Sequence, residues 1–453
     1  MSLLKLKSSV HGLLNQSYIY NCSDNVNFTS MDDAPVIICN NTNIVSILAI
    51  KTFLGDTKIT VIGSLDEKVY SLTDQVLSSN IEYVENVSFW DHKSVLLIDK
   101  KLISEVEQKT NRFLLFICGP DMPSYAVRKN LTKQVFFDVT ALKSMKNINE
   151  ELDSLSINAW DGYLKLLKGP AEIWFRQSLN ATTNKVMSDT TGACLDGYKF
   201  NTASILMSKK LQKLTKGEDN VGVCLPTSVG GYLTILSLMI SAKSIVNLNY
   251  TASEYALNHA IETAGIETII TSRAFVEKLE LKGFFLEKIF SKTKIIYLED
   301  VKASISKFDS IKTFLEVKYL SANMLVKKYV KHTNHDNTAF IIYSSGSEGV
   351  PKGIVIKNKN ILANVYQSTL VVECNEYDSI AVILPIFHGF GLTISLVSLF
   401  QGGWIACHPD PTDAKAVAKL IRENKTTVLC ATPTFLRLYT KNTLRNNEDA
   451  NIL

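Results

Sequence analysis

The second half of the chain alternates short apolar runs with amphipathic segments, and this alternation constrains the fold more than any other feature of the sequence. From about Cys194 onward, runs of strand length are separated by segments of helical periodicity and by glycine or proline. The expected strands are residues 221–225, 244–248, 268–271, 294–298 and 339–343. Strands that alternate with helices favour a parallel sheet covered by helices on both faces. The sequence therefore predicts an α/β fold.

Local signals predict where the elements of this half begin and end. Thr251 and Glu254 have the spacing of a capping box for a helix through residue 264, and Gly265 is expected to end that helix. The last expected strand, residues 339–343, runs directly into a loop rich in glycine and serine. In open α/β sheets, loops at the carboxyl ends of strands are where ligands bind.

The first 165 residues also have the pattern of an α/β domain. Strands are expected at residues 36–39, 59–62, 95–98 and 113–117. We predict two domains, residues 1–165 and 166–453. Residues 156–192 have a less regular pattern and are expected to join them.

Composition and charge exclude several classes of protein. With 46% hydrophobic and 20% charged residues the chain is typical of globular proteins. A net charge of +4, from 48 basic and 44 acidic residues, shows no basic excess of the kind that nucleic-acid binding requires. The eight cysteines lack Cys-x-x-Cys spacing and are typical of buried thiols in a reducing compartment.

The apolar segments predict neither export nor a membrane span. Residues 1–15 lack the continuous apolar core of a signal peptide. The most apolar stretch, residues 232–240, is far shorter than the roughly 20 residues that cross a bilayer. We expect a cytoplasmic protein, whose contact with an inner membrane would be peripheral.

The segment that carries chemistry is the loop of residues 343–353, with the sequence Tyr-Ser-Ser-Gly-Ser-Glu-Gly-Val-Pro-Lys-Gly. Small residues let backbone N–H groups converge on phosphate oxygens, serine hydroxyls add donors, and Lys352 supplies positive charge. The candidate phosphate-binding residues are Ser344, Ser345, Gly346, Ser347, Glu348, Gly349 and Lys352.

This loop differs from the P-loop of ATPases. Lys352 is followed by Gly353 instead of serine or threonine, and a strand, not a helix, is predicted at residues 354–356. A P-loop ATPase is therefore disfavoured. The remaining alternative is a hairpin loop without a ligand, which a bare Gly/Ser cluster usually forms.

The loop resembles the signature of the adenylate-forming superfamily of acyl-CoA synthetases, luciferases and peptide-synthetase adenylation domains. Residues 385–391, Pro-Ile-Phe-His-Gly-Phe-Gly, and residues 431–434, Ala-Thr-Pro-Thr, resemble two further segments of that superfamily. The resemblance implies binding of ATP with Mg²⁺, and an acyl pocket formed by Phe387, His388 and Thr432. A lone histidine beside phenylalanines is more often a core residue. Within the matched segment we expect His388 to orient the substrate.

Four shorter segments resemble one subfamily, the bacterial bifunctional acyltransferase and acyl-acyl-carrier-protein synthetase that re-acylates 2-acylglycerophosphoethanolamine. These segments are residues 248–252, 271–273, 345–349 and 361–365. The resemblance covers nearly all of residues 195–445. It implies that a fatty acid and ATP give acyl-adenylate and pyrophosphate. Thioester formation on acyl-carrier protein or CoA and acyl transfer to a lysophospholipid would follow.

The subfamily resemblance also implies a glycerophosphate-acyltransferase-like α/β domain in residues 1–165. Its His-x₄-Asp motif would deprotonate a glycerol hydroxyl. Here Asn41 stands in place of the histidine and Ser46 in place of the aspartate, and neither is a base at neutral pH. The Phe-Pro-Glu-Gly element corresponds to Phe-Ile-Cys-Gly ending at Gly119, without the glutamate or the cation that follows it. We predict that acyl transfer is lost, or that this domain never performed it.

The superfamily resemblance further implies a Tyr-Gly-x-Thr-Glu segment whose Glu holds Mg²⁺, an Asp that binds ribose, and a small domain with a catalytic Lys. None occurs before Leu453, so the adenylation domain is expected to be truncated, and no residue is assigned to a metal. Three hypotheses follow. The chain is an enzyme completed by a separately encoded C-terminal half, or an inactive protein that binds acyl groups or carrier protein, or a gene remnant.

Overall fold

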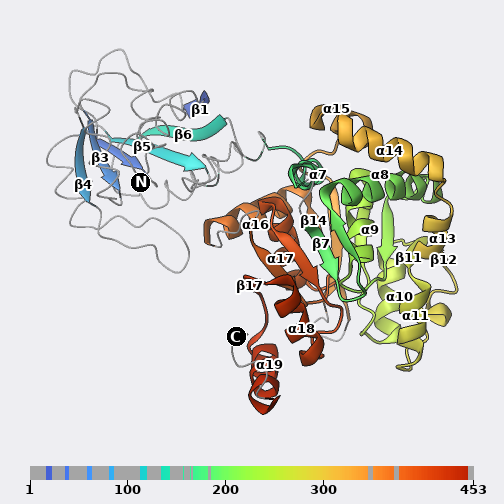
Figure 1. Ribbon diagram of the computed structural model, residues 1–453. Coiled ribbons are helices and arrows are strands. Elements are labelled where there is room, and N and C mark those ends of the chain that lie inside the picture. The colour runs from blue at the N-terminus through green and yellow to red at the C-terminus, as the bar shows by residue number, and fades with distance from the viewer. Residues whose placement is uncertain are drawn as a thin grey trace. The chain divides into compact units, whose positions relative to one another are not determined.

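The computed structural model describes six strands between residues 17 and 142, residues 157, 164 and 167, and then residues 168–181, 185–344, 350–371 and 377–446. The chain divides into two compact units, Met1–Leu167 and Lys168–Leu453 (Figure 1). Among the helices that lie within these described ranges, none is both long enough and apolar enough to cross a bilayer.

The first unit contains a six-stranded sheet in the order β1-β6-β5-β2-β3-β4. The strands are β1 (Ser17–Cys22), β2 (Val36–Cys39), β3 (Ile59–Gly63), β4 (Ile81–Glu85), β5 (Phe113–Gly119) and β6 (Gln134–Leu142). All neighbouring pairs are parallel except β5 and β6. Strands β2, β3 and β5 confirm three predicted strands, and Gly119 ends β5. The expected strand at 95–98, Asn41 and Ser46 lie outside the described residues.

The second unit contains a six-stranded sheet in the order β12-β11-β9-β10-β13-β14. Its strands are β9 (Asn220–Val223), β10 (Ser244–Asn247), β11 (Thr268–Thr271), β12 (Lys294–Tyr297), β13 (Thr338–Ser344) and β14 (Lys352–Lys357). The first five are parallel, and β14 is antiparallel to β13. Each parallel strand overlaps a predicted one, and a strand follows the Gly/Ser-rich loop as expected. The α/β prediction is confirmed for this unit.

A second sheet of this unit has the order β17-β15-β16-β7-β8. Its strands are β7 (Lys185–Asp189), β8 (Cys194–Asp196), β15 (Ser379–Val382), β16 (Trp404–Cys407) and β17 (Val428–Leu429). Strand β7 and helix α7 (Pro170–Asn180) correct the expectation that residues 156–192 form an irregular connection. Trp174 and Phe175 of α7 are fully buried, and β7 pairs with β16, which lies far away in the sequence. Both elements are therefore stabilised by distant partners that local periodicity does not reveal.

Three helices pack against the second sheet, namely α8 (Gly197–Leu214), α9 (Val229–Ile240) and α17 (Gly389–Gln401). Helix α9 packs on both β10 and β7, so it separates the two sheets. Nearly every residue of α9 is buried, and the hydroxyl of Tyr232 meets Ser395 Oγ of α17 at 2.6 Å. This buried polar pair joins the helices through a satisfied hydrogen bond.

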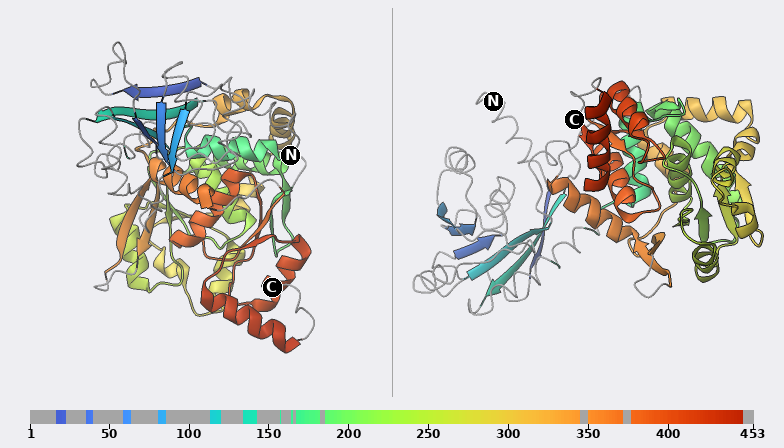
Figure 2. Two further views of the ribbon diagram at one scale, coloured as in Figure 1. Left: turned by 90° about the vertical axis from the view of Figure 1, so that its left-hand side faces the viewer. Right: turned by 90° about the horizontal axis from the view of Figure 1, so that it is seen from below.

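The remaining helices cover the outer faces of the second unit. They are α10 (Glu254–Thr263), α11 (Arg273–Glu280), α12 (Leu286–Ile289), α13 (Leu298–Ala303), α14 (Lys307–Tyr319), α15 (Ala322–Tyr329), α16 (Asn358–Val371), α18 (Ala414–Asn424) and α19 (Pro433–Asn446). Helix α14 packs on α8. Two views show α14 and α15 at the opposite end of this unit from α18 and α19 (Figures 1 and 2).

The start of α10 corrects one local prediction. Ser253, and not Thr251, caps this helix, because Ser253 Oγ accepts a hydrogen bond from Ala256 N at 3.3 Å. Thr251 instead donates its hydroxyl to Asn249 Oδ1 at 2.7 Å, so a local turn occupies its side chain. Gly265 follows the helix with φ +59°, as expected of a terminating glycine.

Candidate functional site

The carboxyl ends of strands from both sheets of the second unit meet at one edge. Three hydrogen bonds cross between the sheets at this edge. They are Thr227 Oγ1 to Leu384 O at 3.0 Å, Val229 N to Asp189 Oδ2 at 2.9 Å, and Asn247 Nδ2 to Ile386 O at 3.0 Å. The loop after β15, which holds the predicted residues Phe387 and His388, is thereby joined to the ends of β9 and β10.

Ser344 and Lys352 lie opposite each other at the loop end of the β13–β14 hairpin. They are register partners in an antiparallel ladder, so their side chains project to the same face of the sheet. Lys352 is exposed and Ser344 is half-buried. The predicted residues Ser345, Gly346, Ser347, Glu348 and Gly349 lie outside the described residues. A hydroxyl and an ammonium group therefore flank the loop on one face.

The hairpin is held in place by Tyr343, which lies opposite Gly353. A Cβ atom placed on Gly353 would lie only 3.1 Å from Tyr343 Cζ, so the glycine permits the close approach of this ring. The Tyr343 hydroxyl meets Thr263 Oγ1 of α10 at 2.7 Å. The hairpin is thus fastened to α10 just before the loop begins.

A cavity of about 280 Å³ lies beside this hairpin. Its lining residues come from the end of β10, from α10 and from the hairpin, and are Asn247, Leu248, Asn249, Ala252, Ser253, Ala256, Leu257, Ala260, Tyr343, Ser344 and Pro351. Ala256 and Ala260 are one helical turn apart, and their small side chains leave room in front of α10. Leu248 and Leu257 make the wall apolar, whereas Ser344 is polar. The cavity suits a ligand with an apolar body and a polar end.

The cavity lies at a topological switch point of the sheet β12-β11-β9-β10-β13-β14. Strands β10 and β13 are neighbours, but the chain leaves β10 toward β11 and leaves β13 toward β14, on the other side. In open α/β sheets, ligands bind in the crevice that such opposite connections create at the carboxyl ends of the strands. The position of the cavity is therefore that of a ligand site.

Asn247 is a site residue that the sequence analysis missed. It ends β10, is 2% exposed and lines the cavity. Its Nδ2 donates to Ile386 O, while its Oδ1 is buried and has no hydrogen-bond partner in the described part of the chain. A buried acceptor without a partner costs about 1–3 kcal/mol, which a donor on a ligand would recover. Its position at the end of a predicted parallel strand was the available signal.

Phe387 packs in the core beside the cavity. It is 9% exposed, and its ring meets Tyr250 edge-to-face with centroids 4.8 Å apart. Tyr250 meets Phe275 in the same way at 4.8 Å, and burial raises the pKa of the Tyr250 hydroxyl. The same apolar cluster contains Leu248 and Leu257 of the cavity wall. Phe387 therefore packs in the cluster that forms the apolar wall of the cavity, although it is not itself a lining residue.

The other two predicted acyl-pocket residues begin helices. His388 is exposed, and its Nδ1 caps α17 by accepting from Phe390 N at 3.4 Å. The carbonyl of Thr432 accepts from Leu436 N at 3.1 Å in the first turn of α19. Neither residue is part of the cavity lining. The structure thus brings Phe387 close to the cavity wall and assigns His388 and Thr432 helix-terminal positions.

His408 is a second buried polar residue that the sequence analysis missed. It follows β16 and is 8% exposed. Its Nδ1 lies 2.7 Å from Thr190 Oγ1, and its Nε2 is buried without a hydrogen-bond partner in the described ranges. Burial lowers the pKa of His408 below 6.5, and the nearby carboxylates of Asp413 and Asp410 oppose this shift. The folded protein therefore favours the neutral imidazole.

We expect His408 to make the folded state less stable in acid. Because its pKa is lower in the folded chain, the unfolded chain binds the proton more readily, and stability is lost as pH falls from 6.5 through the folded pKa. His408→Gln should therefore lose less thermal stability than the wild type between about pH 7.5 and about pH 5.5. Differential scanning calorimetry at several pH values measures this. His332→Gln, at an exposed position, controls for loss of a histidine, and parallel curves for His408→Gln and the wild type would contradict the expectation.

The described residues do not fit a Mg²⁺ site. Carboxylate oxygens are the protein ligands that Mg²⁺ prefers. No carboxylate is among the described lining of the cavity, and no group of three or more His, Cys, Asp or Glu side chains that could hold a metal is found in the described ranges. We therefore assign no residue to Mg²⁺ and derive no step through it.

Comparison with known proteins identifies similar chains. The family described as "AMP-binding enzyme" matches residues 197–451, more than half of the 453 residues. A probable 4-coumarate–CoA ligase 3 from Dictyostelium discoideum is 27% identical over 257 residues, which cover 54% of this chain and 45% of that protein. Long-chain-fatty-acid–CoA ligase 1 from Schizosaccharomyces pombe is 27% identical over 204 residues, which cover 42% of this chain and 28% of that protein. The chain thus spans less than half the length of these curated relatives.

Solved structures show the same fold. The N-terminal domain of FACL13 from Mycobacterium tuberculosis matches with a TM-score of 0.51 at 16% identity, covering 63% of this chain and 68% of that one. A fatty acyl CoA synthetase from Mycobacterium tuberculosis matches with a TM-score of 0.50 at 18% identity, covering 64% of this chain and 54% of that one. At such identities the likeness concerns the fold alone.

Proposed function

The chain belongs to the AMP-binding enzyme family, and we propose that it acts in the ATP-dependent activation of a carboxylic acid. In this reaction the carboxylate attacks the α-phosphate of ATP, an acyl-adenylate forms, and pyrophosphate leaves. The observation that supports the proposal best is the pairing of Ser344 with Lys352 beside a cavity that has an apolar wall. This arrangement offers one site for phosphates and an adjoining site for the acid.

The residues of the hairpin would hold the polyphosphate. Lys352 would place its ammonium group against the phosphate oxygens, and the hydroxyl of Ser344 would donate a hydrogen bond to them. Residues 345–349 remain predicted hydrogen-bond donors to the phosphate oxygens. A hydrogen bond to a charged group contributes about 1.5–3 kcal/mol, and these contacts also favour the leaving pyrophosphate.

We propose a fatty acid as the substrate. The wall formed by Leu248 and Leu257 matches an alkyl chain, and the hydroxyl of Ser344 would face the carboxylate end. The names of the Dictyostelium relatives make 4-coumarate the competing class of acid. Acyl-carrier protein or CoA would accept the acyl group, and a lysophospholipid would receive it afterwards. A separately encoded polypeptide that supplies the Glu, Asp and Lys of the superfamily is part of this proposal.

A role in binding without catalysis is the second candidate. For residues 1–165 it is favoured by Asn41 and Ser46, which stand in place of the acid–base pair of the acyltransferase motif. In this case the chain binds a fatty acid or carrier protein and turns over nothing. The two candidates share the cavity and differ in turnover.

The exchange of labelled pyrophosphate into ATP tests the function. With the chain, ATP and Mg²⁺, we expect exchange that depends on hexadecanoate and is weaker with 4-coumarate. The reaction is run with and without the C-terminal part of a fatty acyl CoA synthetase. Exchange only with 4-coumarate rejects the fatty acid, and hexadecanoate binding by calorimetry without any exchange favours the second candidate.

Ala256→Phe should block the cavity. The phenyl ring would project from α10 into a cavity of about 280 Å³, so we expect decanoate binding to weaken at least about tenfold while ATP binding is kept. Isothermal titration calorimetry measures both ligands. The matched control is Glu262→Phe, at an exposed position of the same helix. Equal decanoate affinity in both variants would place the acid elsewhere.

A further inference from the structure

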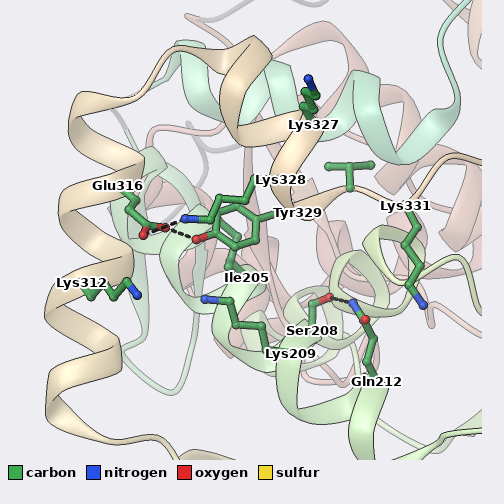
Figure 3. A pocket seen from close by; sticks show the side chains of 11 residues that line it. Ile205, Ser208, Lys209, Gln212, Lys312, Glu316, Lys327, Lys328, Tyr329 and Lys331 are labelled. Carbon is green, nitrogen blue, oxygen red and sulfur yellow. Dashed lines mark hydrogen bonds and ion pairs between the residues drawn. The ribbon is translucent and has the colours of Figure 1, made fainter.

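A second cavity, of about 470 Å³, lies between α8, α14 and the end of α15 (Figure 3). Its lining is rich in lysine and consists of Ile205, Ser208, Lys209, Gln212, Lys312, Glu316, Lys327, Lys328, Tyr329, Val330 and Lys331. None of these residues lines the first cavity. Neither the motifs of the sequence nor the proposed activation reaction uses them.

This cavity lies toward the amino ends of the strands. Lys331 N donates to Ile240 O, the last residue of α9, at 2.9 Å, and Ser208 Oγ meets Ser241 Oγ at 2.8 Å. Ser241 precedes β10, whereas the first cavity lies where β10 ends. The two cavities therefore lie at opposite ends of the parallel strands in the sheet β12-β11-β9-β10-β13-β14.

Positive charge dominates the lining, with five lysines and one carboxylate. Glu316 is already paired with Lys328 Nζ at 2.9 Å and accepts a hydrogen bond from the Tyr329 hydroxyl. No ion pair to Lys209, Lys312, Lys327 or Lys331 is found in the part of the chain that the structure describes. The cavity thus has more cationic groups than its own carboxylate can neutralise.

Lys209 and Lys312 face the cavity from opposite helices. In Figure 3 the ammonium group of Lys209 points from α8 toward that of Lys312 on α14. Lys209 Nζ also lies 4.8 Å from the centre of the Tyr329 ring and 3.5 Å from Thr313 Oγ1. These contacts hold the Lys209 side chain at the cavity without giving it a counterion.

The electrostatics of Lys209 favour an anion in this space. Burial lowers the pKa of Lys209, Glu316 and Asp309 oppose the shift, and Lys328 and Lys312 add to it. The attraction of an anion between Lys209 and Lys312 would offset both the loss of hydration and the repulsion. Gln212, whose Nε2 donates to Ser208 Oγ at 3.2 Å, adds an amide at the same wall for hydroxyl groups of a ligand.

We propose that this cavity binds the phosphate group of a small molecule, with Lys209 and Lys312 as its counterions. A phosphate dianion matches two lysines on opposite walls, and the volume lies within the range of small-molecule sites. The phosphate belongs either to a free metabolite or to a lipid headgroup. Phe308, Ile311 and Leu315 of α14 are 73%, 63% and 47% exposed and lie on one helical face, so the lipid source is tested as well.

Calorimetry with inorganic pyrophosphate tests the site in the full-length chain. The variants are the double substitution Lys209→Gln/Lys312→Gln, Lys352→Gln at the loop, and Lys318→Gln as a matched control on an exposed part of α14 outside the cavity. We expect a binding component that Lys352→Gln and Lys318→Gln retain and that the double variant weakens at least about tenfold. Failure of the proposed activation reaction leaves this result unaffected.

Vesicle sedimentation distinguishes the two sources of phosphate. Binding to phosphatidylglycerol vesicles but not to phosphatidylcholine vesicles, lost in the double variant, assigns the site to a lipid headgroup. Pyrophosphate binding without vesicle binding assigns it to a free metabolite. The proposal is overturned if the wild type binds neither, or if the double variant keeps wild-type affinity for whichever probe binds.

Discussion

Lys352→Gln is expected to weaken ATP binding by about 10- to 100-fold, because it removes a charge-assisted contact of about 1.5–3 kcal/mol from the polyphosphate. Ser344 would keep its hydroxyl opposite the substituted residue, so part of the phosphate site would remain. Isothermal titration calorimetry with ATP measures the change directly. The exchange reaction should fall at least as far, since the same contact stabilises the leaving pyrophosphate.

The matched control for this experiment is Lys357→Gln in the same strand. Lys357 lies opposite Thr338 at the other end of the hairpin and forms an ion pair with Asp336 at 3.3 Å. It carries the same charge as Lys352 but is remote from the loop. We expect ATP affinity within about twofold of the wild type. If both variants lose affinity equally, the effect comes from net charge and the loop is not the phosphate site.

Gly391→Ala is expected to destabilise the second unit by about 3 kcal/mol, the upper end of the usual cost of overpacking. A Cβ atom on Gly391 would lie 2.3 Å from Pro385 O and 3.0 Å from Leu384 O. Both contacts are with backbone, so the start of α17 would have to move away from the loop after β15. That movement would also break the bonds from Thr227 and Asn247 to this loop.

Gly389→Ala, two residues earlier, is the control for this substitution. A Cβ atom on Gly389 would meet nothing within 4 Å among the described residues. We expect its stability to stay within about 0.5 kcal/mol of the wild type. Urea denaturation followed by fluorescence gives both midpoints. Equal midpoints for the two variants would show that the loop after β15 moves without a loss in the free energy of unfolding.

The elements that the sequence predicted are those whose signal is local. The strand at residues 339–343 and the strand after the loop are apolar runs on either side of the Gly/Ser-rich loop, and their pairing places Ser344 opposite Lys352. Thr251 shows the limit of such signals. Ser253 and Thr251 both have side chains that can cap a helix, and the hydrogen bond from Thr251 to Asn249 decides between them.

The second sheet and the missed site residues depend on distant contacts. Strand β7 pairs with β16, which follows more than 200 residues later, so its five residues carry no pattern that predicts the pairing. Asn247 is a polar residue at the end of β10, and His408 directly follows β16. Whether such side chains are buried depends on the contact between the two sheets, which a single sequence does not specify.

Asn247 gives the first cavity a mechanical connection to the second sheet. One end of its planar amide is bonded to the carbonyl of Ile386, and the other end borders the cavity with an unused acceptor. A ligand that donates to this oxygen is connected through one planar amide to the peptide of Ile386, two residues ahead of His388. We therefore expect occupation of the cavity and the position of the loop after β15 to depend on each other.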